Sequence, residues 1–185
     1  SKPTGDKDCV IVDTAQLRRA IDSLLDAADV VTNAGDRRTP PPPGEWDADQ
    51  ILAHVSMVNA MTIATAYAVA SGCSPTCDNR IAQDTWTIGR TIDRAGGTAG
   101  LVARIRGQCD ALGALGRPVL GDSDLDTPIP TLLVSKGTLL VDMQIPLREL
   151  IAGLAEQEIP GHTRQLLALV ETNPGSGSAS IPHSV

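Results

Sequence analysis

The chain has 185 residues, of which 42% are hydrophobic and 20% are charged, and its formal net charge is -7. This composition is typical of a single globular domain that is long enough to bury its own core. The basic residues are scattered along an acidic chain, which argues against a nucleic-acid partner. No apolar run reaches the roughly 18 residues of a membrane span. We therefore expect a cytoplasmic protein with neither a nucleic-acid nor a membrane partner.

Aromatic residues make up only 2% of the chain, and Phe is absent. The core must therefore consist of Leu, Ile, Val, Ala and Met, which suits packed helices. Apolar residues recur every three or four positions from Leu17 to Val31, so the first helix is expected over about residues 14–33. The proline run at 40–43 then forms a stiff connector that cannot be helical.

The second helix has a clear start signal. Asp47 offers an N-cap and Gln50 lies three positions later, which is the spacing of a capping box, while Trp46 stands at the staple position. Ile51, Val55 and Val58 then share one face, and the helix is expected to end near residue 72.

Residues 78–115 are predicted to be a third helical region that Gly96 and Gly97 break or bend. Residues 129–145 have the pattern of a loose hairpin, too short to found a sheet. Pro146 suits the first turn of a last helix. The prediction is an all-α four-helix domain over residues 1–172, with an extended or hairpin segment before its last helix and a flexible C-terminal tail over 173–185.

The cysteines fit neither a zinc ribbon nor a dense disulfide framework. We expect reduced structural thiols. The alternative is a small local disulfide between Cys73 and Cys77.

The last helix carries polar residues on its apolar stripe. The stripe set by Leu150 and Leu154 continues at 3.6 residues per turn through Glu158, His162 and Gln165. These three polar residues are therefore predicted to face inward.

The inward polar residues suggest a metal site. Glu158 and His162 are spaced i, i+4, which brings both side chains to one helix face. His54 shares the inward sector of the second helix, so the three residues would form a His₂Glu set with an open position. The alternatives are a single buried, hydrogen-bonded His54 and a buried ion pair between Glu158 and His162. Gln165 would orient a ligand or contact substrate, and the alternative is a semi-exposed residue on the flank of the helix.

Pro160 makes the geometry of this set conditional. Proline in a helix removes one backbone hydrogen bond and bends the axis. If the helix instead begins anew at Pro160, then Glu158 lies outside it and need not reach the histidines.

The segment from Trp46 to His54, with Ile51 and Leu52 between them, and the late His162-x-x-Gln165 resemble the DinB-like superfamily, which includes the mycothiol-dependent maleylpyruvate isomerases. The resemblance covers about residues 14–171. It implies a four-helix bundle, with zinc or nickel held by three histidines. Two of these ligands fall on His54 and His162, and the third falls on Glu158, a departure that adds negative charge.

The resemblance also implies a function. A metal-dependent S-transferase or isomerase would use the thiolate of a low-molecular-weight thiol, such as mycothiol, on a small electrophilic substrate. Related bundles commonly pair into homodimers. The rival hypothesis is a metal-free helical bundle that binds a small ligand or a protein partner without catalysis.

Overall fold

The computed structural model describes residues 12–170, so the tail predicted from residue 173 and Cys9 lie outside the described residues. The longer helices are α1 (Ala15–Thr32), α2 (Ala48–Ala70), α4 (Thr85–Ala95), α5 (Thr98–Gly113), α7 (Leu147–Gly153) and α8 (Ile159–Leu167). Shorter turns are η1 (Gly35–Arg37), α3 (Arg80–Gln83), η2 (Ala114–Gly116), α6 (Asp122–Leu125) and the π-helical η3 (Leu154–Glu158). The strands are β1 (Cys77–Asp78), β2 (Pro128–Ser135) and β3 (Thr138–Pro146).

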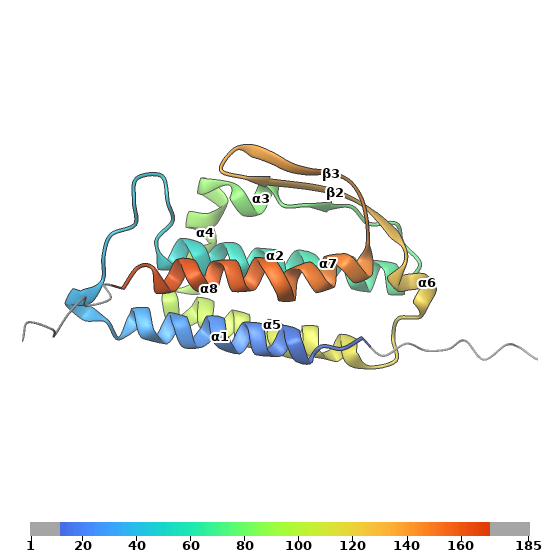
Figure 1. Cartoon of the computed structure of the whole chain (residues 1–185), viewed down its shortest axis with the longest axis horizontal. Helices are drawn as coiled ribbons and strands as arrows, with labels where there is room; N and C mark the ends of the chain where they lie inside the picture. Colours follow the sequence, from blue (N-terminus) through green and yellow to red (C-terminus); the bar gives the residue numbers. More distant parts are fainter. Residues whose placement is uncertain (1–11, 171–185) are drawn as a thin grey trace, which may run out of the picture.

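The long helices run side by side and enclose the core (Figure 1). Helix α1 packs against α5 and α8, and α2 packs against α5, α4 and α8. The core is aliphatic, as the composition predicts, with Ile21, Leu52 and Ile105 fully buried. The predicted interruption of the third helical region is confirmed, because α4 ends at Gly96 in the left-handed conformation.

Helix α2 is built as its sequence predicts. The side chain of Asp47 accepts a hydrogen bond from the backbone N–H of Gln50 at 2.9 Å, and Gln50 Oε1 accepts one from Asp47 N–H at 2.9 Å. This reciprocal capping box fixes the first turn. The helix is long and apolar enough to cross a membrane by those two measures alone, but 61% of its most apolar window is buried in the fold. It is the central helix of the core.

The last helix is continuous across Pro160. Helix α7, the π turn η3 and α8 follow one another from Leu147 to Leu167, and Ile159 N–H bonds to Leu154 O across five residues. A proline ring clashes with the carbonyl four residues earlier and lacks an N–H. The wide π turn directly before Pro160 accommodates both defects. Glu158 therefore stays within the helical run.

The expectation that residues 129–145 are too short to found a sheet is wrong. Strand β2 pairs antiparallel with β3, with Ile129 opposite Ile145, and parallel with β1, with Cys77 opposite Thr131. The hairpin thereby pairs with β1, the segment after α2, and the three strands form one sheet. The fold is mostly helical with this small sheet, not all-α.

The side chain of Asn79 holds the first strand to the hairpin. Its amide donates to Val134 O at 3.0 Å, and its Oδ1 accepts from Val134 N–H at 2.8 Å. Cys73, Cys77 and Cys109 are free thiols, as expected, and the alternative of a local disulfide between Cys73 and Cys77 is not formed. This segment is held by the sheet instead.

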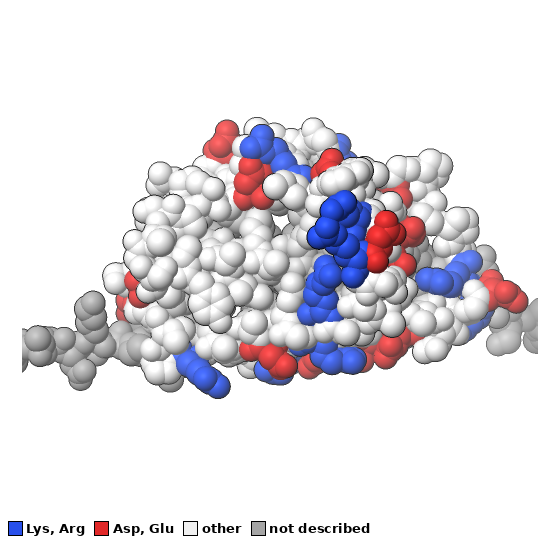
Figure 2. Space-filling view, turned by 180° about the vertical axis from the view of Figure 1, so that it is seen from behind, with Lys and Arg blue, Asp and Glu red and all other residues white. Residues whose placement is uncertain are grey.

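Charged side chains form small mixed groups on the face that Figure 2 shows, with basic and acidic residues side by side. The left half of that face is largely uncharged. Several arginines are paired locally: Arg80 with Asp78 at 2.6 Å, and Arg148 with Asp126 at 2.7 Å.

Candidate metal centre

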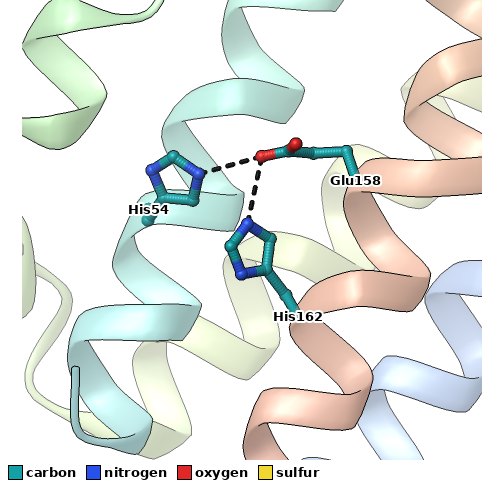
Figure 3. A group of neighbouring side chains, drawn as sticks. All are labelled: His54, Glu158 and His162. Atoms are coloured by element: carbon teal, nitrogen blue, oxygen red, sulfur yellow. Dashed lines mark hydrogen bonds and ion pairs between the residues drawn. The ribbon is translucent and has the colours of Figure 1, made fainter. Parts of the chain in front are cut away.

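Three side chains from distant parts of the chain converge at one point (Figure 3). His54 comes from α2, Glu158 from the end of η3, and His162 from α8. His54 Nε2 and His162 Nε2 each lie 3.0 Å from the same carboxylate oxygen, Glu158 Oε1. The three candidate ligand atoms all lie within 4.8 Å of one another. The structure thus brings together the three residues that the sequence singles out.

The environment of His54 fixes its tautomer. The side chain is fully buried, and Nδ1 lies 2.7 Å from the backbone carbonyl of Ala82 in α3. A carbonyl oxygen only accepts, so Nδ1 carries a proton and donates it. In the neutral ring, Nε2 is then an unprotonated lone pair directed at the Glu158 carboxylate. That contact is stable only if a proton or another cation lies between the two atoms.

His162 has the same arrangement with a side-chain partner. Its Nδ1 lies 2.6 Å from Gln165 Oε1, and its side chain is 13% exposed. The amide oxygen accepts the Nδ1 proton, which again directs the Nε2 lone pair at Glu158. Imidazoles that bind metals are commonly oriented in this way by a second hydrogen bond. Gln165 therefore lies where the sequence predicts an orienting residue.

Glu158 is ionised in this setting. Burial alone would raise its pKa, but hydrogen bonds and charge interactions with His162 and His54 outweigh burial and hold that pKa well below its ordinary value. The carboxylate is 39% exposed, so one side of it faces open space. The centre consequently offers one negative oxygen with two imidazole nitrogens directed at it.

The donor set fits a divalent metal ion. Ligand atoms around a tetrahedral zinc lie about 3.3 Å apart. To admit the ion, the two 3.0 Å contacts would lengthen slightly, and the ligand atoms that are separated by up to 4.8 Å would approach each other. Imidazole suits zinc and nickel, and two imidazoles with one carboxylate leave a further position open. These three side chains are therefore candidate ligands for a metal ion.

Trp46 covers the two imidazoles. Its ring centroid lies 4.8 Å from that of His54 and 6.3 Å from that of His162. The sequence predicts a packing role at the entrance of the second helix but not this contact. The staple position directly before the N-cap is the signal that places Trp46 near the first turns of α2.

A cavity of about 860 Å³ opens beside the three residues. Its lining comes from α2, both hairpin strands and the helical run α7–η3–α8, and includes Trp46, His54, Glu158 and His162. A volume of this size holds a small organic molecule. A fourth ligand position at the metal centre would open into this space.

Comparisons with protein families, curated proteins and solved structures find no match to the chain. What the centre can do must be judged from its geometry. Two oriented imidazoles and an ionised carboxylate at the wall of a cavity can hold a metal ion next to a bound small molecule.

Proposed function

We propose that the protein is a metal-dependent enzyme that uses a low-molecular-weight thiol, as an S-transferase or isomerase acting on a small electrophile. The observation that carries this proposal is the convergence of two Nε2 atoms on one carboxylate oxygen at the cavity wall. The Nδ1 atom of each ring has another hydrogen-bond partner, which leaves Nε2 as the ligand atom. Such an arrangement provides three ligands for a cation.

Each residue of the centre has a defined task. His54 and His162 supply neutral nitrogen ligands, and Glu158 supplies the charged oxygen. The Ala82 carbonyl and Gln165 hold the two rings in the binding tautomer. Trp46 keeps water from one side of both rings. When bound, a divalent zinc or nickel ion would lower the pKa of a coordinated thiol so that the thiolate forms near neutral pH.

The thiol of the reaction comes from a cosubstrate, because the cavity's own cysteine is a poor nucleophile. Cys77 lines the cavity, and burial, together with the nearby charge of Asp78, raises its pKa to about 11. At neutral pH it is a protonated thiol, whereas the thiolate is the reactive form. A small external thiol can instead reach the open position beside Glu158.

Membership of the DinB-like superfamily, with its four-helix bundle, belongs to this proposal. Its support is the segment from Trp46 to His54, the late pair His162 and Gln165, and the packing of α1, α2, α5 and α7–α8. By this analogy the thiol is mycothiol, the protein is cytoplasmic, and the chain pairs into homodimers.

The rival function is ligand binding by a metal-free protein. The observation that favours it is that 3.0 Å is also an ordinary hydrogen-bond distance, so protons on both rings satisfy the same contacts. A protonated cluster would hold Glu158 as a structural ion pair. The two functions differ in whether turnover depends on a metal.

A thiol-transfer assay tests the proposal. Protein purified without an affinity tag is loaded with zinc and assayed with a thiol and a panel of uncharged and charged electrophiles. Thiol-dependent turnover should disappear on chelation and return with zinc. Glu158→Gln should abolish turnover, whereas Asp26→Asn, the same change of charge on the exposed face of α1, should not. Turnover that survives chelation would contradict the metal mechanism.

A further inference from the structure

The cavity beside the centre has walls that favour one class of substrate. We propose that it binds an uncharged electrophile and discriminates against substrates that carry carboxylates. This inference deepens the proposed function and rests on it for the role of the bound molecule as substrate. The preference itself is a property of the metal-free walls, because a bound divalent ion would add positive charge beside the cavity.

The walls of the cavity combine aliphatic with polar side chains. Helix α2, the hairpin and α7 contribute its apolar lining, which includes Val58, Met61, Leu133, Val141, Ile145 and Leu150. Contact with such surfaces contributes a binding free energy of roughly 25 cal/mol for each Å² of apolar ligand surface that is removed from water. The aliphatic or aromatic part of a substrate therefore gains binding energy where it contacts these side chains.

Three of the uncharged polar residues of the lining donate their side-chain hydrogen bonds to the backbone. Thr62 Oγ1 donates to Val58 O at 3.0 Å, and Thr65 Oγ1 donates to Met61 O at 2.8 Å. The Asn79 amide donates to Val134 O. These three donors are not free for a carboxylate, and a buried charge without partners is costly.

The charges of the lining also oppose an anion. Among the described residues that line the cavity, Lys136 is the one lysine or arginine, and it is paired with Glu45. Glu149 and Glu156 line the cavity as well and are exposed at its edge. Like charges repel an entering carboxylate, and the single cation is already neutralised.

Cys77 gives independent evidence on how the cavity treats negative charge. Its thiol lies in the lining, and its raised pKa has burial as the main cause. The same desolvation that disfavours the Cys77 thiolate disfavours any other anion placed beside it. A neutral molecule escapes this penalty.

Tryptophan fluorescence can measure the preference directly. Trp46 lines the cavity, whereas Trp86 is 69% exposed on α4, so Trp86→Phe leaves one reporter at the site. The metal-free Trp86→Phe protein is titrated with 4-phenylbutanamide and with 4-phenylbutanoate, which differ in charge but little in shape. The amide should bind at least about tenfold more tightly. Equal or tighter binding of the carboxylate, or no binding of the amide, would overturn the inference.

A charge-reversal pair isolates the cause. Glu149→Lys with Glu156→Lys, both at exposed positions, should reduce the preference for the amide at least about threefold. Asp26→Lys with Asp29→Lys makes the same change of net charge on α1 and should leave the preference unaltered. Equal effects of the two pairs would show that net charge, not the cavity edge, sets the preference. Because these titrations need no metal, they can fail while zinc-dependent turnover is present, and the reverse also holds.

Discussion

The two helices that supply the imidazoles differ in how they bring their ligands to the centre. Helix α2 is a regular α-helix whose capping box, apolar composition and burial all place His54 inward. The run α7–η3–α8 is interrupted by a π turn and a proline, yet it delivers Glu158 and His162 to the same point. The first ligand lies on a regular helix, whereas the other two lie on a helical run that contains a backbone irregularity.

Burial follows the same division. The side chain of His54 is 0% exposed, that of His162 is 13% exposed and that of Glu158 is 39% exposed. The half of the centre on α2, which is His54, is therefore rigid and shielded from water. The half on the run α7–η3–α8, which is Glu158 and His162, borders the cavity. We expect changes in the two halves to have different effects on metal affinity and on stability.

Removal of the buried ligand should have the largest effect. His54→Ala should weaken zinc binding by at least about 100-fold, since the loss of a ligand exceeds the 10- to 100-fold cost of an outer partner. His162→Ala should weaken zinc binding less, because a water molecule can reach the vacated ligand position and replace the imidazole. Competition with a chromophoric chelator measures both affinities. A larger loss for His162→Ala would break the proposed contrast between a rigid half and an adaptable half.

Cys77, in the strand that follows α2, should make stability fall in alkaline solution. Its pKa in the folded protein is about 11, above the ordinary 9.0, so the folded state holds the proton more tightly than the unfolded chain. The stabilisation is complete below pH 9 and should be lost as the pH rises to 11, by roughly 2 kcal/mol. Urea denaturation of the parent and Cys77→Ala across this range measures it. Parallel pH curves for the two proteins would contradict the assignment.

Pro160 should matter to the metal centre more than to the fold. Pro160→Ala restores a backbone donor, so the π turn can relax to an α-helix, which turns Glu158 by about 100° relative to α7. Zinc affinity should fall by about tenfold, while the free energy of unfolding changes by less than about 1 kcal/mol. Pro146→Ala, at the start of α7, is the matched control and should leave affinity unaltered. An affinity unchanged by Pro160→Ala would show that the π turn does not position Glu158.

The capping box should contribute stability without affecting metal binding. Asp47→Ala removes the acceptor for Gln50 N–H and should cost about 1 kcal/mol in the free energy of unfolding. Zinc affinity should be unchanged, because the contacts of α2 with the core fix the position of His54. Asp29→Ala, at an exposed position of α1, is the control in urea denaturation. A marked loss of zinc affinity in Asp47→Ala would mean that α2 is less rigid than its burial indicates.

The regular half of the centre was predictable from sequence because its determinants are local. A capping box spans four residues, and the apolar face of α2 recurs at the helical period. The i, i+4 spacing of Glu158 and His162 is equally local, so the grouping of the three residues follows from two helix faces. The orienting carbonyl of Ala82 has no sequence signal, because every residue carries one.

The irregular parts depend on tertiary context. A two-residue strand such as β1 gains its stability from a partner more than 50 residues away, Thr131, so no local pattern marks it. The π turn violates the period of 3.6 on which the helical pattern rests. Pro160 marked the place where regular geometry must fail, but the sequence left open whether the helix bends or ends.

A zinc titration of protein purified without an affinity tag tests the central claim most directly. The parent should bind one zinc ion per chain, and Glu158→Gln, which keeps the size of the side chain but removes its charge, should bind it far more weakly. Asp26→Asn should behave as the parent. Substoichiometric zinc in the parent, unchanged by Glu158→Gln, would contradict the assignment of His54, Glu158 and His162 as a metal centre.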